Sequence, residues 1–542
     1  MAKKQTGTHE YLFRTAAATA VAAAMLTGCG LRKSPVAEET LIETVLSGTP
    51  YEEGAETETV IDFPVPDNIP GILIDRTGYE CESSKQVIFT GDGVGDSFSV
   101  VNADSGAVVY SGEIRQRSAA NAAAPAVWRG DFSEFETPGD YYITTEGLGR
   151  SYTFTIRNDH YALQLADSLK ALHSMRCGDP SVGACHTGES AVALADSVVD
   201  VSGGWHTDGR YDKDTLTGAG MVQNLLMAYE CEPAAFTDGM GLPQSGNGIP
   251  DLLDEIRYET DWLLKMQDES GAVSSGVSTS EVTDYSDPVA DRAQMQIGGV
   301  AEEPTLLFAC ALAHFGAIYR NYDADYADRC LFSAEQAYQY LKEIRDGDEA
   351  AIGNEAWFMV NAELFKTTAK DEYHDEILEI LKSGVLPLES SGRIGGINPV
   401  FFGDYAYLTT GRYADREICG KIMHQIMTTV RDITDASASD PYLIDAPGTG
   451  IVRNETILQR MLLLTYVNCF ITNREYRTVI QEHMHYLGGR NERSEIYLTD
   501  YGVRTKEADA EYYCVADDKE LYYTSVRMVI LSSIDNRYIQ VE

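Results

Sequence analysis

The chain has 542 residues, and 42 basic residues against 84 acidic ones give it a formal net charge of −42 at pH 7. Such a surface repels nucleic acid and anionic lipid, so we expect no nucleic-acid partner, whereas a neutral ligand is compatible with it. The length allows about two to four domains. Ten Cys in a chain of this length are too few for a disulfide scaffold.

The N-terminus has the features of a secretion signal. Three basic residues precede an apolar, alanine-rich run over residues 16–26, which is too short to span a bilayer. Leu26-Thr-Gly-Cys29 follows, and a Cys directly after small residues resembles a bacterial lipobox. We therefore predict a signal peptide over residues 1–28, lipidation of Cys29 and anchoring at the outer face of a bacterial cell membrane. An ordinary signal peptide with an incidental Cys is the alternative.

Residues 29–65 are acidic and have no hydrophobic period. Eight acidic residues lie between residues 30 and 63. A segment of this composition cannot bury enough apolar surface to order itself. We predict a solvated tether between the lipid anchor and the folded part of the chain.

Short runs of alternating apolar and polar residues occupy residues 66–157. Two of them, residues 98–101 and 107–110, flank Asn102-Ala-Asp-Ser-Gly106, which is a hairpin signal. Residues 152–156 alternate with a period of two. Several short strands at this spacing predict a β-sandwich.

The pattern becomes helical over residues 158–542. Its clearest segment is residues 247–267, where Pro250 lies in the first turn and nearby acids favour the helix dipole. We expect about twelve helices without an intervening sheet. Besides the segment at 247–267, helical segments start near Tyr161, Leu216, Pro304, Ser333, Glu355, Glu372, Tyr413, Glu455, Tyr476 and Leu521.

Cys177, Cys185, His186 and His206 form a chemical pattern of their own. Two thiolates and two imidazoles make a closed tetrahedral Zn²⁺ site that leaves no position for water. The spacing is not that of a zinc finger, so a Cys177–Cys185 disulfide and buried side chains without a metal remain alternatives. The cysteines other than these two and Cys29 show no short-range pattern, and we expect most of them to be small buried apolar residues.

Several motifs occur in an order that resembles glycoside hydrolase family 9. Gly203-Gly-Trp-His206, followed by Tyr211 and Lys213, is similar to the family's Gly-Gly-Trp-His/Tyr-Asp-Ala-Gly-Asp-Tyr-Gly-Lys loop. Residues 247–267 resemble its most recognisable helix. Tyr486-Leu-Gly-Gly-Arg-Asn491 and residues 497–502 resemble its Tyr-Leu-Leu-Gly-Arg-Asn and Ser-Tyr-Val-Thr-Gly-Phe-Gly segments. Residues 72–79 and 132–142 look like the immunoglobulin-like module that precedes the catalytic domain in many bacterial members.

The resemblance implies a multidomain β and α architecture, in which an N-terminal immunoglobulin-like β-sandwich is followed by an (α/α)6 toroid. It implies cellulase-like, endo-β-1,4-glucanase-like hydrolysis with inversion, acting on a β-glucan polysaccharide or oligosaccharide, and we expect a monomer. Members with the sandwich hold a structural zinc at positions equivalent to the four Cys and His residues, which favours zinc over the disulfide. A calcium site is compatible with the family, but no residue pattern specifies one.

The family's catalytic residues are only partly retained. Its general base and helper are the two Asp of Asp-Ala-Gly-Asp, and those positions are Thr207 and Arg210, neither of which can take a proton from water at neutral pH. Asp208 stands at the Ala position as a substitute base, and Glu520 corresponds to the late general acid. The family's His-His-Arg substrate motif is absent, since no His follows His485.

The resemblance also assigns three substrate-binding residues, Trp205, Tyr211 and Arg490. Two hypotheses follow from the altered loop. The chain is either an exported glycoside hydrolase with weakened activity, with Glu520 as acid and Asp208 as base, or a catalytically inactive lipoprotein that uses the same fold as a glycan-binding or interaction surface. We favour the hydrolase.

Overall fold

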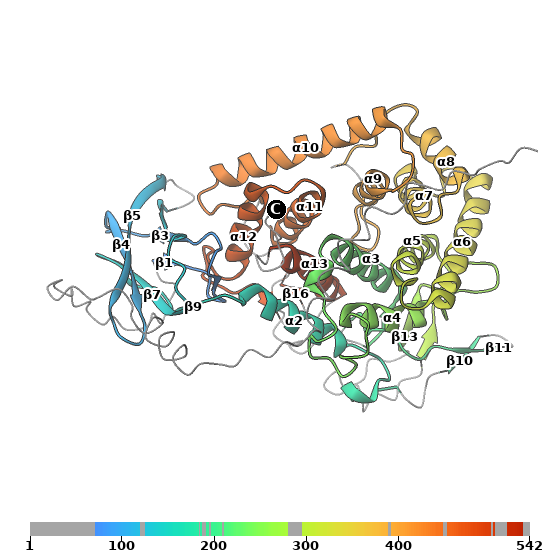
Figure 1. Cartoon of the computed structure of the whole chain (residues 1–542), viewed down its shortest axis with the longest axis horizontal. Helices are drawn as coiled ribbons and strands as arrows, with labels where there is room; N and C mark the ends of the chain where they lie inside the picture. The colour runs from blue at the N-terminus through green and yellow to red at the C-terminus, as the bar shows by residue number, and fades with distance from the viewer. Residues whose placement is uncertain are drawn as a thin grey trace, which may run out of the picture. The chain divides into compact units, whose positions relative to one another are not determined.

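The computed structural model describes residues 71–119, 125–183, 185–186, 191–194, 197–208, 211–279, 295–388, 392–447, 453–499, 502–504 and 518–534 (Figure 1). The side chains of residues 191–198, 279 and 518–521 are outside the described set. The predicted signal peptide, Cys29, the acidic tether, Arg210 and Cys514 also lie outside it. All described residues belong to one compact unit, Thr59–Glu542. No described helix has the length and apolar character needed to cross a membrane.

Nine strands form the N-terminal module. They pair in the order β1-β3-β6-β5-β4-β7-β9-β2, with β8 beside β7. The long β5 pairs with β4 through its first half and with β6 through its second half, so it belongs to both halves of the module. Tyr79, Phe89, Phe98, Phe132 and Phe154 are buried between these halves. The predicted β-sandwich is therefore confirmed. The strands are β1 (Ile72–Leu73), β2 (Tyr79–Glu80), β3 (Gln86–Thr90), β4 (Ser97–Asn102), β5 (Val108–Ser118), β6 (Val127–Asp131), β7 (Gly139–Thr145), β8 (Gly149–Arg150) and β9 (Phe154–Arg157).

The rest of the described chain is dominated by twelve α-helices, in agreement with the predicted toroid. In Figure 1, α3, α5, α7, α9, α11 and α13 lie inside the other helices. The helices are α2 (His160–His173), α3 (Thr215–Cys231), α4 (Asp251–Leu263), α5 (Glu302–Tyr319), α6 (Ala324–Gly347), α7 (Asn354–Thr368), α8 (Asp371–Leu381), α9 (Pro399–Thr409), α10 (Arg416–Ser439), α11 (Asn454–Phe470), α12 (Arg474–Leu487) and α13 (Asp518–Ile534).

Small sheets lie in the loops between helices, which the sequence did not predict. One is the hairpin β10 (Ala191–Leu194) and β11 (Ser197–Asp200), and another is the hairpin β15 (Leu498–Thr499) and β16 (Gly502–Val503). The third joins β12 (Lys213–Asp214), β13 (Gly276–Thr279) and β14 (Met295–Ile297). Because β12 leads directly into α3, this sheet fixes the start of the first inner helix.

The inner helices α5, α7, α9 and α11 begin on one side of the toroid, because their first turns line two neighbouring grooves that share Arg393. Asn224 Nδ2 of α3 donates to Ser525 Oγ of α13 at 3.1 Å, which pairs residues at similar depth in the two helices. The ring of Tyr466 on α11 packs on Phe401 and Phe402 of α9. Neighbouring inner helices also contact one another from α3 through α5 and α7 to α9, and from α11 through α13 to α3. The ring is thus closed by side-chain packing.

The predicted start of one helix was wrong, and one helix was missing from the prediction. Helix α6 begins at Ala324, well before Ser333, because the Asp323 side chain accepts the Tyr326 N–H and caps the helix. Helix α9 was not predicted at all. Its sequence Pro-Val-Phe-Phe-Gly-Asp-Tyr-Ala-Tyr is buried on every side, so it has no apolar face that alternates with a polar one.

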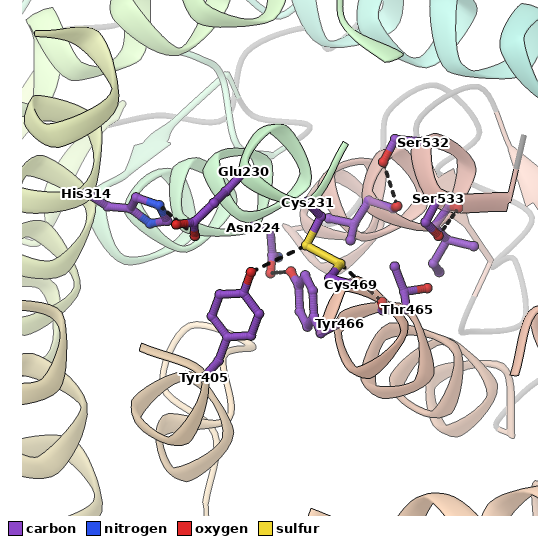
Figure 2. The surroundings of a disulfide bond; sticks show 12 residues. Asn224, Glu230, Cys231, His314, Tyr405, Thr465, Tyr466, Cys469, Ser532 and Ser533 are labelled. Carbon is purple, nitrogen blue, oxygen red and sulfur yellow. Dashed lines mark hydrogen bonds and ion pairs between the residues drawn. A yellow bond between two sulfur atoms is a disulfide. The ribbon is translucent and has the colours of Figure 1, made fainter. Parts of the chain in front are cut away.

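A disulfide joins Cys231, the last residue of α3, to Cys469 near the end of α11 (Figure 2). The Tyr405 hydroxyl lies 3.5 Å from the Cys231 sulfur. The expectation that these two cysteines are unpaired apolar side chains was wrong. The pair could not be predicted from local sequence, because 238 residues separate the two cysteines. Cys81, Cys310 and Cys330 are buried and unpaired, as predicted.

Buried polar contacts join the sandwich to α12. Asp75 Oδ2 lies 2.8 Å from His485 Nδ1, and His485 Nε2 lies 2.9 Å from the Ser84 carbonyl oxygen. Ser84 Oγ also donates to Glu482, which forms a buried ion pair with Arg490. These contacts make the sandwich an integral support of the helical module.

Candidate active site and metal centre

Two grooves open where the inner helices begin. One, of about 550 Å³, is lined by residues of α9, α10 and α11 and includes Glu455 and Gln459. The other, of about 310 Å³, is lined by the first turns of α5 and α7 and includes Glu302 and Glu355. Arg393 lines both grooves, so they meet at this residue. Helix N-termini carry partial positive charge, which complements the acids in these first turns.

The loop of residues 203–214 leads into this end of the toroid. Gly204 has a φ of +79°, and a Cβ there would lie 2.7 Å from the Trp262 ring, so only glycine fits. Thr207 is buried; its Oγ1 accepts the Asp214 N–H at 2.8 Å and donates to the Asp212 carbonyl. The Thr207 hydroxyl therefore stabilises the backbone conformation of the loop.

Asp208 is half-buried in a turn of the same loop. Its Oδ1 accepts the Asp212 N–H at 3.0 Å, and its carbonyl accepts the Tyr211 N–H at 3.2 Å. Asp208 is not among the residues that line the two grooves.

Glu520 is the third residue of α13, and its side chain lies outside the described residues. Two residues further on, the ring of Tyr522 lies against Gly396: a Cβ on this glycine would be 2.4 Å from it. Gly396 follows Arg393 in the loop before α9. The backbone of Glu520 therefore enters the toroid close to the groove residues.

Two of the three predicted substrate-binding residues do not fit that role. Trp205 is fully buried, and its indole N–H donates to Glu255 Oε1 at 2.8 Å. Arg490 is fully buried as well, in its ion pair with Glu482. Neither side chain can touch a polysaccharide from these positions, because both are enclosed by protein. The half-buried Tyr211 packs edge-on against the His206 ring, with 5.3 Å between ring centroids.

Cys177, Cys185, His186 and His206 come together as the sequence pattern predicts. One potential ligand atom from each lies within 4.8 Å of all the others, and all four residues are buried. Cys177 Sγ is 3.5 Å from His186 Nδ1, and Cys185 Sγ is 3.0 Å from His206 Nε2. Two ligands of one tetrahedral zinc lie about 3.5 Å apart. The two cysteines are not joined by a disulfide. This cluster can hold a metal ion.

The polarity around the cluster favours metal binding. His206 Nδ1 lies 2.7 Å from the Tyr211 carbonyl oxygen, so Nδ1 carries the proton and Nε2 offers its lone pair to the cluster. The Cys185 thiol has its pKa lowered, first by the hydrogen bond from Cys177 and then by the two histidines. A thiolate is the form of cysteine that binds a metal.

Glu255 and Glu259 of α4 support this cluster, a role that sequence reasoning missed. Glu255 is fully buried and binds Arg176, the neighbour of Cys177, at 2.8 Å. Glu259 accepts the backbone N–H of Trp205, the neighbour of His206, at 2.6 Å. Their spacing could have indicated this role, because residues four apart lie on the same face of a helix. In the structure, this face of α4 points inward.

The comparisons with known proteins agree with this architecture. The model of the family "Glycosyl hydrolase family 9" matches residues 161–508, and that of the "Cellulase N-terminal ig-like domain" matches residues 67–150. Endoglucanase D of Acetivibrio thermocellus is 25% identical over 441 residues, which are 75% of this chain and 69% of that protein. A cellodextrinase of Butyrivibrio fibrisolvens is 23% identical over 473 residues (80% and 85%). A xyloglucan-specific endo-β-1,4-glucanase of Bacteroides ovatus is 24% identical over 502 residues (83% and 84%).

Solved structures show the same fold. A metagenome-derived glycoside hydrolase family 9 endoglucanase superposes with a TM-score of 0.74 at 24% identity, covering 85% of this chain and 99% of that one. A zinc-binding triple mutant of a family 9 endoglucanase superposes with a TM-score of 0.72 at 25% identity, covering 84% and 99%.

A sandwich followed by a helical toroid is the fold that this chain shares with the solved family 9 endoglucanases. The family model matches more than half of the chain. The chain therefore belongs to glycosyl hydrolase family 9, and it carries that family's N-terminal immunoglobulin-like domain.

Proposed function

We propose that this chain is an exported hydrolase that cleaves the O-glycosidic bonds of β-linked glucans or their oligosaccharides with inversion. The observation that carries the proposal is the pair of grooves that meet at Arg393 where the inner helices begin. A joined groove can accommodate several successive sugar units. The endoglucanase, cellodextrinase and xyloglucan-specific glucanase among the relatives support a β-glucan substrate.

The proposed chemistry uses two carboxyl groups. An inverting enzyme needs a general acid on the leaving oxygen and a general base on a water across the sugar ring, about 6.5–9.5 Å apart. We assign the acid to Glu520 and, from its place in the altered catalytic loop, the base to Asp208. Because Asp208 does not line the grooves, its carboxylate has to leave the Asp212 N–H to reach a water there. Thr207 and Arg210 stand where the family has its base and helper, so we expect turnover to be weak, since losing a general base costs about 10²–10⁴-fold.

Hydrolysis of cellotetraose and of soluble xyloglucan tests this assignment. Asp208→Asn should abolish the residual activity, and Thr207→Asp with Arg210→Asp should raise it. Asp212→Asn is the matched control in the same loop, and it should retain wild-type activity because the family has a glycine there. Proton NMR of the first product anomer tests inversion. Vigorous turnover that survives both Asp208→Asn and Glu520→Gln would show that the catalytic pair is misassigned.

The second candidate is a catalytically inactive glycan-binding lipoprotein on the same fold. The bonded hydroxyl of Thr207 favours it, because this side chain is fixed in the loop and has no basic group. Saturable binding of cellotetraose without any product, even after prolonged incubation, would support this candidate over the hydrolase.

We propose zinc as the metal of the Cys177–His206 cluster. Two sulfur and two nitrogen donors fill a tetrahedral site, so the metal would be structural and would leave no place for a catalytic water. Metal analysis of purified protein should give about one zinc per chain, and His186→Ala should reduce it. Zinc-free protein with a mapped Cys177–Cys185 disulfide would contradict this proposal.

We also propose that the protein is lipid-anchored through Cys29 at the outer face of a bacterial cell membrane. The supporting feature is Leu26-Thr-Gly-Cys29 after the apolar run. Cys29→Ser should abolish labelling by fatty acid and release the protein from membranes. Membrane association that is unchanged in this variant would refute lipid anchoring at Cys29.

A further inference from the structure

A cavity of about 660 Å³ lies away from the grooves, where the sandwich faces α10 and α12. Strands β3, β5 and β6 form one wall, and the two helices form the other. Its volume falls in the range of roughly 300–1,000 Å³ that is typical of small-molecule sites. Neither the hydrolytic chemistry nor the metal cluster uses these residues.

Arg129, in the middle of β6, is the unusual residue of this cavity. Its Nε and Nη1 atoms are shielded from solvent, and neither has a hydrogen-bond partner. Burial and the nearby charge of Arg117 lower the pKa of the Arg129 guanidinium to about 10, so it is still charged at neutral pH. The Arg129 side chain is half-buried, and N–H groups that are shielded from solvent normally have a hydrogen-bond partner. Arg129 is therefore positioned to receive an anion.

Two of the four acids that line the cavity have an arginine partner. Arg115 pairs with Glu113 at 2.9 Å, and Glu482 pairs with Arg490. The carboxylate of Asp131 accepts the Ser133 N–H, and Glu475 lies in the first turn of α12. Among the described residues, the Arg117 side chain has no hydrogen bond or ion pair, so this cavity offers a second guanidinium near that of Arg129. The lining carries three arginines and four acids, so the unpaired guanidinium nitrogens distinguish this cavity and a net positive charge does not.

We propose that this cavity is a second carbohydrate site, which binds a short acidic saccharide through a uronate carboxylate held by Arg129 and Arg117. A guanidinium matches a carboxylate through two parallel N–H···O bonds. Gln86, Thr434, Ser437 and Thr478 line the cavity and supply partners for sugar hydroxyls, and the Tyr110 ring offers an apolar face. A single carboxylate suits the site, whereas a long polyanion is repelled by the acidic surface.

The test compares methyl β-glucuronide with methyl β-glucoside, which differ in the carboxylate. Saturation-transfer NMR on the whole protein should show saturable binding of the glucuronide and at least about tenfold weaker binding of the glucoside. Arg129→Gln should weaken glucuronide binding at least about tenfold, and Arg117→Gln should weaken it by a smaller factor. Arg115→Gln is the matched control, because Arg115 is exposed and already paired, and it should leave binding within about threefold of wild type.

Several outcomes would overturn the proposal. The proposal fails if the wild type shows no saturable glucuronide binding, or if it binds the two sugars equally. It also fails if Arg129→Gln binds the glucuronide as well as the wild type does. Inorganic sulfate is the second probe. If it binds at Arg129 and the glucuronide does not, the cavity is an anion site and the saccharide assignment is wrong. If Arg129→Gln does not fold, the substitution of the exposed Arg117 serves as the test. A loss of glucuronide affinity of less than about twofold in Arg117→Gln would then refute the site.

Discussion

The buried carboxylate of Glu255 offers the sharpest test of how this fold supports the cluster of Cys177, Cys185, His186 and His206. Glu255 accepts hydrogen bonds from Arg176 at 2.8–3.1 Å and from Trp205 Nε1 at 2.8 Å, and it lies 3.0 Å from His173 Nδ1. Burial alone would raise the pKa of Glu255, but the bonds from His173 and Arg176 outweigh burial and lower it. The carboxylate is therefore charged at pH 7.

We predict that Glu255→Gln lowers the free energy of unfolding by about 3–5 kcal/mol, because it removes the buried negative charge that binds Arg176 and leaves Asp179 as the remaining acidic partner. The figure agrees with the loss of about two hydrogen bonds to a charged group, at roughly 1.5–3 kcal/mol each. Arg176 precedes Cys177, and Trp205 precedes His206. We therefore also expect zinc affinity to fall by about 10–100-fold, as for other losses of groups that orient metal ligands.

Glu259 is the matched control, one helical turn along the same face. It is fully buried, and desolvation raises its pKa to about 8, so it is mostly neutral at pH 7. Glutamine has nearly the shape and the charge of a protonated glutamic acid, and its carbonyl can still accept the Trp205 N–H. Because glutamine needs no proton on folding, Glu259→Gln should not destabilise the protein at pH 7 and should raise the free energy of unfolding there by up to about 3 kcal/mol.

Guanidinium unfolding of the zinc-loaded protein at pH 7, followed by far-UV circular dichroism, measures both variants. A zinc chelator titration on the same samples measures retention of the metal. Equal destabilisation by the two substitutions, or a larger loss from Glu259→Gln, would show that the charge assignment of the two carboxyl groups is wrong.

Three further predictions concern the disulfide, pH and metal. Reducing the Cys231–Cys469 bond should lower the free energy of unfolding by about 5 kcal/mol, since the bond spans 238 residues of sequence. Between the ordinary Glu pKa of 4.5 and about 8, Glu259 holds a proton only in the folded state. Its contribution to stability is therefore complete below pH 4.5 and falls by about 1.4 kcal/mol per unit as pH rises towards 8; Glu259→Gln should remove this slope. Chelating the metal should lower the melting temperature, and His186→Ala should abolish that response.

Each of these has its own contradicting result. A reductant that also destabilises a Cys231→Ala, Cys469→Ala variant would show that the effect lies elsewhere. Parallel pH–stability curves for wild type and Glu259→Gln would mean that Glu259 does not hold an extra proton in the folded state. A chelator response that persists in His186→Ala would place the structural metal at other ligands.

The sequence by itself determined the architecture. Alternation with a period of two predicted the sandwich, and helical spacing of apolar residues predicted the helical module, because these periods follow from strand and helix geometry alone. The same logic failed for α9, whose inner position buries all of its faces. The four side chains of the Cys/His cluster were also recognisable, since two thiols and two imidazoles match the donor set of a tetrahedral metal site.

Only the tertiary structure decided how distant residues are used. The Cys231–Cys469 bond requires two inner helices to meet at the same depth, and no local pattern records this. Trp205 and Arg490 were expected to touch substrate, yet partners from α4 and α12 enclose them. In the sequence, Glu255 and Glu259 look like ordinary solvent-exposed acids of an amphipathic helix, but the fold buries both of them. Whether a polar side chain faces solvent, a ligand or a buried partner depends on what packs against it, and that packing is set by the whole chain.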